Sequence, residues 1–228
     1  MTDIVGITGC SGGIGQALQT WLENRNVKVL AFVRNPGPLE YPLDVTWPAH
    51  SIVEVMRLAA EHIGAFNGWI NLAGADILRE PLRSLPYEER LMQLWQTDVL
   101  GSIRCCRAVL PFLAEDSCVV NVGWDEIWTG HRGSAGELYA TAKAAVTAYS
   151  LSWAQSAGPN RRVFVAAPGW VKTRWADTLS QAQLSQTARK IPGGAWQSAR
   201  MVAQAIGQLV MERASIPTGT IRRIGETS

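Results

Sequence analysis

Residues 3–15 read DIVGITGCSGGIG, and this stretch decides the fold. An apolar run ends at Thr8 and passes at once into a turn that contains four glycines. From residue 14 to residue 25, apolar side chains recur at helical spacing. The stretch therefore predicts a strand, a tight glycine-rich turn and a helix, in that order.

The same alternation continues along the rest of the chain. Short apolar runs predict strands at 27–33, 69–72, 118–122, 162–167 and 220–224. Segments with helical periodicity lie at 50–63, 88–113, 138–157 and 196–211. Continuous apolar runs are typical of parallel strands that are buried on both faces. We therefore expect an α/β fold in one domain, residues 1–228, with a Rossmann-type doubly wound parallel sheet of about seven strands and helices on both faces.

The composition is that of a folded protein with little overall charge. Hydrophobic residues make up 47% of the chain, and the net charge is only +2, so disorder and a strong attraction to nucleic acid are excluded. No apolar run reaches the roughly 18 residues of a membrane span, and the first residues do not resemble a secretory signal. The four cysteines and three histidines lack metal-ligand spacing. We expect a cytoplasmic protein with reduced thiols, no metal, and no nucleic-acid or membrane partner.

A glycine-rich turn between a strand and a helix is typical of a phosphate site. Glycine lets the backbone approach a pyrophosphate, and the helix N-terminus supplies N–H groups and the positive end of its dipole. The spacing here is Gly9-x-x-x-Gly13-Ile14-Gly15, which differs from G-x-G-x-x-G. In its strand–turn–helix context the motif favours a dinucleotide site over a simple tight turn.

Four further motifs follow in order: Asp44-Val45, Asn71-Leu72-Ala73-Gly74, Tyr139-x-x-x-Lys143 and Pro168-Gly169-Trp170-Val171-x-Thr173. Together with the glycine turn they resemble the short-chain dehydrogenase/reductase family, from Ile4 to about Gly219. The resemblance implies an oxidoreductase that uses a nicotinamide cofactor. It places Asp44 on the adenine amino group, and Val171 and Thr173 on the nicotinamide carboxamide. The cofactor-binding residues that it implies are Gly9, Ser11, Gly13, Ile14, Gly15, Asp44, Val45, Asn71, Ala73, Gly74, Tyr139, Lys143, Pro168, Gly169, Val171 and Thr173.

The end of the second strand bears on the choice of cofactor. NAD-specific enzymes commonly have an acidic residue there, on the ribose 2′-OH. Here that position is Val33, and Arg34 follows it. A guanidinium can bind a 2′-phosphate through two charge-assisted hydrogen bonds, so we expect NADP(H) rather than NAD(H). The alternative is that Arg34 is only a surface arginine, and Gly12 stands where many NADP-preferring relatives have a second basic residue.

Tyr139 and Lys143 are four residues apart and share one face of a helix. A free tyrosine titrates near 10, and a neighbouring ammonium lowers that pKa. The pair then suits proton exchange with an alcohol or carbonyl oxygen. The alternative is a buried tyrosine beside a structural lysine.

Two other catalytic positions of the family are changed in this chain. The family has a serine after the fifth strand, but alignment on the strand puts Trp124 there, and counting back from Tyr139 gives Glu126. Ser134 is the nearest upstream serine, and we expect it in a loop. The family's asparagine on the long helix corresponds to Asp98. The implied catalytic set is therefore Tyr139, Lys143, Asp98 and Trp124.

These changes leave three outcomes open. Asp125 or Glu126 could replace the serine as a polar group. A substrate that is already activated, such as an iminium, a quinonoid or a conjugated enone, would need no serine. The third outcome is a protein that binds the cofactor and catalyses nothing.

Tryptophan is unusually frequent, with ten residues in the chain. Five map to the expected cleft or its cover: Trp124, Trp128, Trp170, Trp175 and Trp196. Flat aromatic walls favour a bulky or aromatic ligand. The alternative is packing in the core or in a dimer, which we favour for Trp21, Trp69 and Trp153. The resemblance makes residues 174–196 a substrate lid.

The leading hypothesis is an NADP(H)-dependent oxidoreductase with Tyr139 as the acid/base. Its substrate would be a bulky or aromatic small molecule with a carbonyl or alcohol, or a conjugated C=C or C=N. One alternative is a dinucleotide-binding scaffold or regulatory protein with an impaired active site. Another is an enzyme that isomerises or dehydrates without net redox change. The resemblance also implies a homodimer or homotetramer, formed by helices 88–113 and 138–157.

Overall fold

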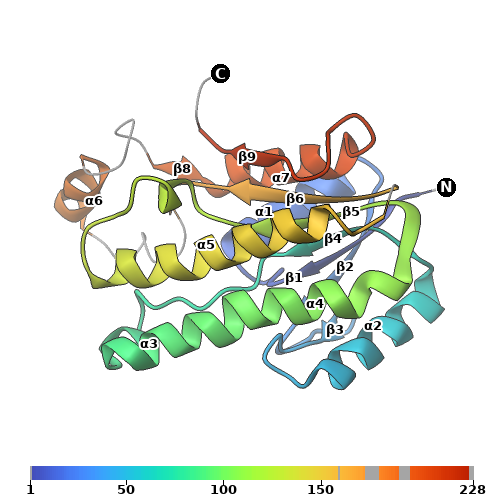
Figure 1. The fold of residues 1–228 in the computed structure, drawn as a ribbon, viewed down its shortest axis with the longest axis horizontal. Coiled ribbons are helices and arrows are strands. Elements are labelled where there is room, and N and C mark those ends of the chain that lie inside the picture. Colours follow the sequence, from blue (N-terminus) through green and yellow to red (C-terminus); the bar gives the residue numbers. More distant parts are fainter. Residues whose placement is uncertain (1, 159, 173–179, 190–195, 226–228) are drawn as a thin grey trace.

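The computed structural model describes residues 2–158, 160–172, 180–189 and 196–225 (Figure 1). Seven parallel strands form one sheet in the order β3-β2-β1-β4-β5-β6-β9. The strands are β1 (Ile4–Thr8), β2 (Lys28–Val33), β3 (Tyr41–Pro42), β4 (Phe66–Asn71), β5 (Leu113–Val122), β6 (Arg161–Ala167) and β9 (Ile221–Arg223). The strand order reverses between β1 and β4, and ligands of such sheets bind at the carboxyl ends of the strands on either side of this point.

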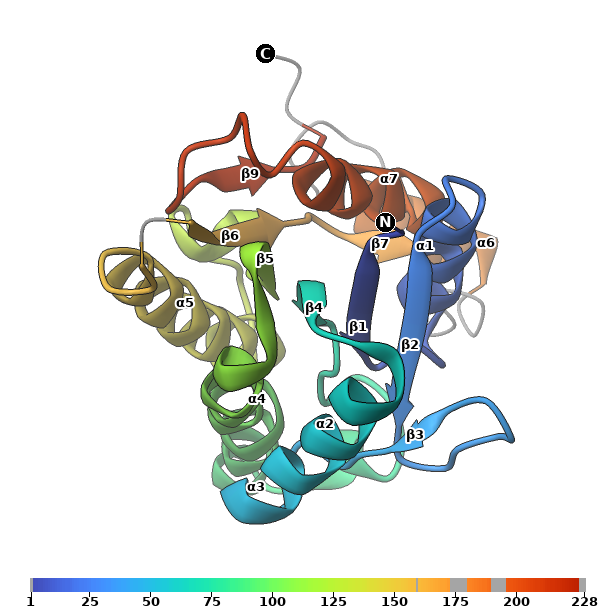
Figure 2. The same cartoon turned by 90° about the vertical axis from the view of Figure 1, so that its right-hand side faces the viewer.

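Helices cover both faces of the sheet (Figure 2). One face carries α1 (Gly13–Glu23) and α7 (Ala199–Met211), and the other carries α2 (Ala49–Ile63), α4 (Gly101–Val109) and α5 (Ser134–Ala154). A separate hydrophobic cluster fills the space on each face. The predicted doubly wound α/β fold is confirmed.

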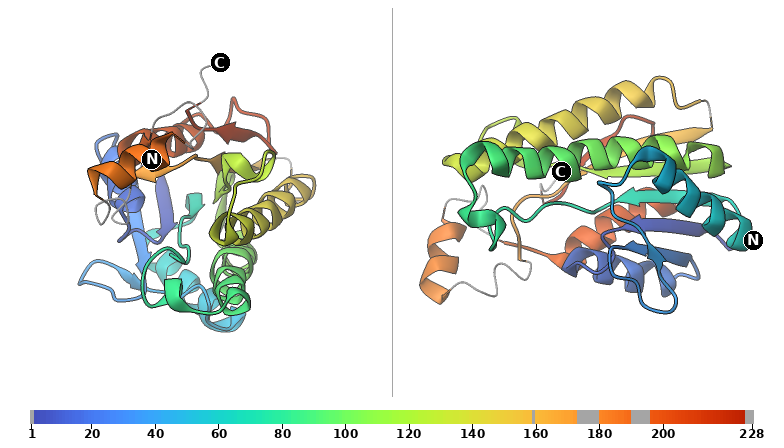
Figure 3. Two further views of the ribbon diagram at one scale, coloured as in Figure 1. Left: turned by 90° about the vertical axis from the view of Figure 1, so that its left-hand side faces the viewer. Right: turned by 90° about the horizontal axis from the view of Figure 1, so that it is seen from below.

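The segment predicted as one long helix at 88–113 is a continuous rod made of consecutive helical segments of different types. It consists of α3 (Tyr87–Leu94), the π-helix η2 (Trp95–Leu100), α4 and the 3₁₀ turn η3 (Leu110–Phe112). Figure 3 shows the rod in green beside α5 in yellow. The π-helix widens the rod at Asp98, and such insertions often occur at functional sites.

Several boundaries differ from the sequence prediction. The sequence contains no signal for the edge strand β3, because a strand of two residues shows no periodicity. Ser134, expected in a loop, is the first residue of α5. The last helix begins at Ala199 rather than 196, because β8 (Gln197–Ser198) pairs with β7 (Val171–Lys172) in a second, two-stranded sheet.

Three tryptophans outside the cleft serve in packing, as predicted. Trp69 is fully buried and packs against Phe32 with ring centroids 4.9 Å apart. The Trp21 ring lies over Gly207 of α7, where a Cβ would come within 2.3 Å of it. Trp153 stacks on Tyr149 at 6.0 Å. Among the described residues, no helix combines the length and apolarity that a membrane crossing requires.

Candidate active site

A cavity of about 370 Å³ opens at the carboxyl ends of the strands. Its wall combines the glycine turn, the loop after β4, the π-helix, the end of β5, the start of α5 and the loop after β6. Of the residues predicted for the site, those that line it are Gly9, Gly13, Ile14, Gly15, Gly74, Asp98, Trp124, Tyr139, Lys143, Pro168, Gly169 and Val171.

The glycine turn is a close-packed cradle with one open position. Gly9 has a φ of +71°, and a Cβ there would lie 2.7 Å from the backbone nitrogen of Ala73. A Cβ at Gly15 would lie 2.6 Å from the Cys10 and Gly9 carbonyl oxygens. At Gly13 a Cβ would meet no atom within 4 Å, and the N-cap residue of α1 is Gly12, which has no side chain. The turn therefore presents bare backbone and a helix N-terminus to the cavity, which is the chemistry of a phosphate site.

Some predicted cofactor residues lie outside the cavity wall. Arg34 is exposed directly after β2. The end of β2 lies close to the glycine turn, since Gly9 N donates a hydrogen bond to Phe32 O at 3.2 Å. Ser11 is exposed within the turn. The Asp44 carboxylate accepts hydrogen bonds from Thr46 N and Oγ1 at 2.9 and 2.7 Å.

Three other predicted cofactor residues contribute packing or hydrogen bonds around the site. Val45 is buried against the start of α4, where a Cβ at Gly101 would lie 2.7 Å from Val45 Cγ2. Ala73 supports Gly9 with its backbone. Asn71 is buried and donates from Nδ2 to Asn121 Oδ1 at 2.8 Å. Thr173 lies outside the described residues.

A buried chain of hydrogen bonds runs beneath the site, and its outer members were not predicted. Trp69 Nε1 donates to Asn71 Oδ1 at 2.9 Å, and Asn121 Nδ2 donates to Ser150 Oγ at 2.8 Å. With the Asn71–Asn121 bond, the chain ties β4 and β5 to α5. The only signal in the sequence is a polar Asn121 within an apolar strand.

Tyr139, Lys143 and Asp98 form a compact group on one side of the cavity. Lys143 Nζ lies 5.3 Å from the centroid of the Tyr139 ring and 2.8 Å from Asp98 Oδ2. The second carboxylate oxygen, Asp98 Oδ1, accepts a hydrogen bond from Ala75 N at 2.8 Å. Lys143 and Asp98 are both buried, and their ion pair lies directly beside the tyrosine.

The electrostatics of this group correct one expectation. Burial raises the pKa of Tyr139; Lys143 lowers it, Asp98 raises it again, and the net direction is upward. Burial pushes the pKa of Lys143 down, but attraction to Asp98 and Tyr139 outweighs it and raises that pKa overall. The prediction of a lowered tyrosine pKa is wrong chiefly because burial of the phenol outweighs the effect of Lys143, and Asp98 adds to the rise.

Trp124 is the residue that stands beside Tyr139. Its ring meets the Tyr139 ring edge-on with centroids 5.2 Å apart, and it lines the cavity. Glu126, the alternative position for the family's serine, is not part of the cavity wall. Ser134 Oγ accepts a hydrogen bond from Arg90 Nη2 at 3.1 Å and also lies outside the wall. The alignment on the strand therefore identifies the residue that faces the tyrosine.

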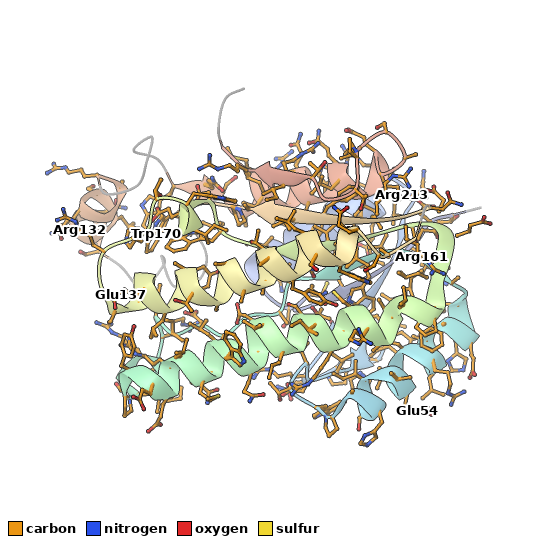
Figure 4. All side chains as sticks on the ribbon, in the orientation of Figure 1. Glu54, Arg132, Glu137, Arg161, Trp170 and Arg213 are labelled. Atoms are coloured by element: carbon orange, nitrogen blue, oxygen red, sulfur yellow. The ribbon has the colours of Figure 1, made fainter. Side chains whose placement is uncertain are left out.

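Glu126 instead organises the expected aromatic wall of the cavity, a role that sequence reasoning missed. Its carboxylate is buried, 2.5 Å from His131 Nδ1, and accepts a hydrogen bond from Trp170 Nε1 at 2.9 Å. Trp170 lies beside the loop that follows β5 (Figure 4). The centroid of the Trp170 ring lies 5.0 Å from that of His131 and 6.3 Å from that of Trp124. This wall is assembled from two loops that are far apart in the sequence.

Two other tryptophans expected at the cleft or its cover, Trp128 and Trp196, do not line the cavity. Trp196 packs edge-on against Trp170 at 5.9 Å and donates from Nε1 to Leu184 O of α6 (Gln181–Ala188) at 3.2 Å. Trp128 is half exposed, with the Arg223 guanidinium 5.0 Å from its ring. Trp175 lies outside the described residues, as does most of the predicted lid 174–196.

Asp125 is the second acidic residue after β5, and it also lies outside the cavity wall. Its Oδ1 is buried without a hydrogen-bond partner, and its Oδ2 approaches Gly169, where a Cβ would be 2.6 Å away. Burial and then repulsion from Glu126 raise the pKa of Asp125 to about 6, against the attraction of Arg223. Among the described residues, no group of three or more His, Cys, Asp or Glu side chains is arranged to hold a metal ion.

The chain is similar to known proteins over most of its length. A family model described as enoyl-(acyl carrier protein) reductase matches residues 16–224. The 3-oxoacyl-[acyl-carrier-protein] reductase FabG of Vibrio cholerae is 28% identical over 93% of this chain and 91% of its own length. Carbonyl reductase family member 4 of Xenopus laevis is 27% identical, over 90% of each chain.

Solved structures share the fold at lower sequence identity. A short-chain dehydrogenase/reductase from Brucella melitensis has a TM-score of 0.84 and 20% identity, over 97% of this chain and 94% of that one. ElxO with NADP bound has a TM-score of 0.86 and 20% identity, over 98% and 97% of the two chains.

Proposed function

Because the chain belongs to the short-chain dehydrogenase/reductase family, we propose that it is an NADP(H)-dependent oxidoreductase with Tyr139 as its acid/base. The observation that carries the proposal is the shared cavity. Tyr139 and Lys143 line the same cavity as the glycine turn, so a cofactor on the turn and a substrate on the tyrosine would meet within it.

The residues present fit a nicotinamide dinucleotide. The open position at Gly13 leaves room for phosphate oxygens against the N-terminus of α1. Gly9, Ile14 and Gly15 complete that end of the cavity, and Pro168, Gly169 and Val171 line its other side. When bound, the cofactor supplies or accepts a hydride.

Tyr139 would handle the proton. In reduction its hydroxyl donates a proton to the substrate oxygen, and in oxidation its phenolate accepts one. Lys143 keeps a positive charge next to the phenol, and Asp98 holds that ammonium in place. Trp124 closes the site beside the tyrosine and excludes water from it.

The substrate that we propose is a bulky or aromatic small molecule with a carbonyl or alcohol, or a conjugated C=C or C=N. Trp124 and Trp170 both line the cavity, and aromatic rings bind flat apolar groups by area burial and stacking. A substrate that needs only one hydrogen-bond donor suits this site, because Trp124 carries no hydroxyl toward the reacting group.

The preference for NADP(H) rests on Arg34. It is exposed next to the glycine turn, where a guanidinium could reach a 2′-phosphate. Fluorescence titration with NADPH and then NADH, with the tryptophans as energy donors, tests the preference. We expect NADPH to bind at least about tenfold more tightly, which corresponds to about 1.4 kcal/mol.

The Arg34→Ala variant should lose this difference, with NADH affinity unchanged. Lys28→Ala is the matched control, since Lys28 is an exposed cation at the start of the same strand. A wild-type protein that prefers NADH would contradict the role of Arg34. A protein that binds neither nucleotide would contradict the oxidoreductase proposal.

The alternative function is a dinucleotide-binding scaffold or regulatory protein. The buried Trp124 at the position of the family's serine, and the pairing of Lys143 with Asp98, favour it. Tight NADPH binding without turnover in a screen of carbonyls, enones and imines would support the scaffold. NADPH consumption that is lost in Tyr139→Phe would support the enzyme.

Further proposals follow from the family. We propose one domain over residues 1–228, a lid over 174–196, a cytoplasmic location and a homodimer or homotetramer. The rod from α3 to α4 lies alongside α5 on the outer side of the sheet (Figure 3), which supports an interface there. Light scattering in solution measures the oligomeric state.

A further inference from the structure

The cation beside Tyr139 is held by a carboxylate of this chain. Lys143 Nζ lies 2.8 Å from Asp98 Oδ2, and both side chains are buried. Asp98 cannot easily turn away, because its other oxygen accepts a hydrogen bond from Ala75 N at 2.8 Å. A Cβ at Gly74 would lie 3.1 Å from Asp98 Oδ2, so the backbone also packs closely on the carboxylate.

Charged side chains from several elements line the cavity that contains Tyr139. Among the described residues that line the cavity, the charged ones are Lys143 on α5, Asp98 on η2, and Asp76 and Arg79 on the loop after β4. Asp76 and Arg79 are exposed, so water screens them strongly. The buried charges are thus one ammonium and one carboxylate in contact. Lys143 acts on the pKa of Tyr139 more strongly than Asp98 does, and Asp98 offsets part of that effect.

We propose that Asp98 is a positioning residue that holds Lys143 and offsets part of its charge at Tyr139, so that the tyrosine acts as a proton donor. This inference rests on the proposed function and deepens it. In the forward step a hydride adds to the substrate carbon while the Tyr139 O–H bond breaks and its proton passes to the substrate oxygen. The C=O becomes CH–OH, the cofactor is oxidised, and the phenolate regains a proton from solvent.

The direction of the reaction is thereby tied to pH. Reduction needs the neutral phenol, which burial and Asp98 favour by raising the pKa of Tyr139. Oxidation of an alcohol needs the phenolate, which the same rise in pKa disfavours. The site is suited to a reductase, and the reverse reaction should rise steeply with pH above neutrality.

The test measures the ionisation of Tyr139 directly and does not depend on turnover. Tyrosinate absorbance in the near ultraviolet is titrated from neutral pH to the highest pH at which each variant stays folded. The same titration of its Tyr139→Phe counterpart is subtracted, which removes the other three tyrosines. In Asp98→Asn we expect the Tyr139 transition to move down by about one pH unit or more, because Lys143 is released to act on the phenol. Asp76→Asn is the matched control, an exposed carboxylate in the same cavity, and should move the transition much less.

A second variant keeps the test decisive if Asp98→Asn fails to fold. Asp98→Asn combined with Lys143→Met removes both charges, and buried ion pairs often tolerate joint neutral replacement. Because Lys143 acts on Tyr139 more strongly than Asp98 does, the Tyr139 transition in this double variant should lie at or above that of the wild type. A double variant that titrates below the wild type would overturn the proposal, because the downward shift could then not come from a released Lys143. An unchanged transition in a folded Asp98→Asn would also overturn it.

The pH dependence of turnover provides the independent readout. In Asp98→Asn, the rise of alcohol oxidation with pH should move to lower pH by the same amount as the tyrosinate transition. The spectroscopic shift without turnover in any variant would contradict the proposed function and support the role of Asp98. Turnover that depends on Tyr139, with no spectroscopic shift, would support the proposed function and contradict the role of Asp98.

Discussion

Trp170 donates its indole N–H to the Glu126 carboxylate over 2.9 Å, although the two residues come from different loops. Glu126 follows β5, and Trp170 follows β6. The neighbouring strands β5 and β6 are parallel, so both loops emerge at the same edge of the sheet. The bond fixes an aromatic wall of the cavity through a buried carboxylate that does not itself line it.

Glu126→Leu should therefore destabilise the fold while leaving the nucleotide site intact. The substitution leaves Trp170 Nε1 and His131 Nδ1 without their partner, which costs roughly 1–3 kcal/mol. Glu126→Gln keeps an oxygen that accepts from Trp170 and should cost less. Urea unfolding measures the stability, and fluorescence titration measures NADPH affinity. A large loss of NADPH affinity in Glu126→Leu would contradict the separation of wall and nucleotide site.

Two glycines of the same turn should respond differently to alanine. Gly9→Ala places a Cβ 2.7 Å from Ala73 N at a positive φ, and we expect a loss of stability of at least about 1–2 kcal/mol. Gly13→Ala meets no atom within 4 Å, so the fold should keep its stability. The new methyl group would instead occupy the space for phosphate and weaken NADPH binding. Thermal unfolding and NADPH titration of both variants make the comparison; equal stability losses would contradict it.

Asp125 should make the protein less stable as the pH rises from about 4 to about 6. Burial raises its pKa from 3.8 to about 6, so the folded state binds the proton more tightly than the unfolded state does. Stability from this group is present below about pH 4 and is lost as the pH rises through about 6. Asp125→Asn removes this dependence. The variant should gain stability relative to the wild type at pH 7 compared with pH 4, by thermal unfolding at both values. A difference that does not change with pH would contradict the raised pKa.

Removing one partner of the buried ion pair should cost more than removing one of an exposed pair. Asp98→Ala leaves the Lys143 ammonium buried without its carboxylate, which typically costs about 3–5 kcal/mol. Glu54→Ala is the control, because Glu54 pairs with Arg57 on the exposed surface of α2, where ion pairs contribute little. We expect a large drop in the unfolding midpoint for the first variant and no measurable change for the second. Similar midpoints for both would show that water reaches the Asp98–Lys143 pair.

Most of the fold and part of the site could be predicted from the sequence. The strands of a parallel sheet are buried on both faces, so they appear as continuous apolar runs, and helix-length crossovers between them leave few arrangements. Gly9 and Gly15 are required by contacts within their own turn or with the adjacent strand end, so local sequence reveals them. Tyr139 and Lys143 share a helix face at fixed spacing, and both line the cavity as expected.

Only the tertiary structure decided how these groups act on one another. The sequence gives the identity of Asp98, but its contact with Lys143 depends on the π-helix and on how η2 packs against α5. The direction of the Tyr139 pKa depends on burial and on that pairing, and neither leaves a local signal. The bonds of Glu126 to His131 and Trp170 likewise join separate parts of the chain. Short-range patterns determine the elements and their order, whereas charge, burial and side-chain contacts in the site arise between elements and exist only once the sheet has brought their ends together.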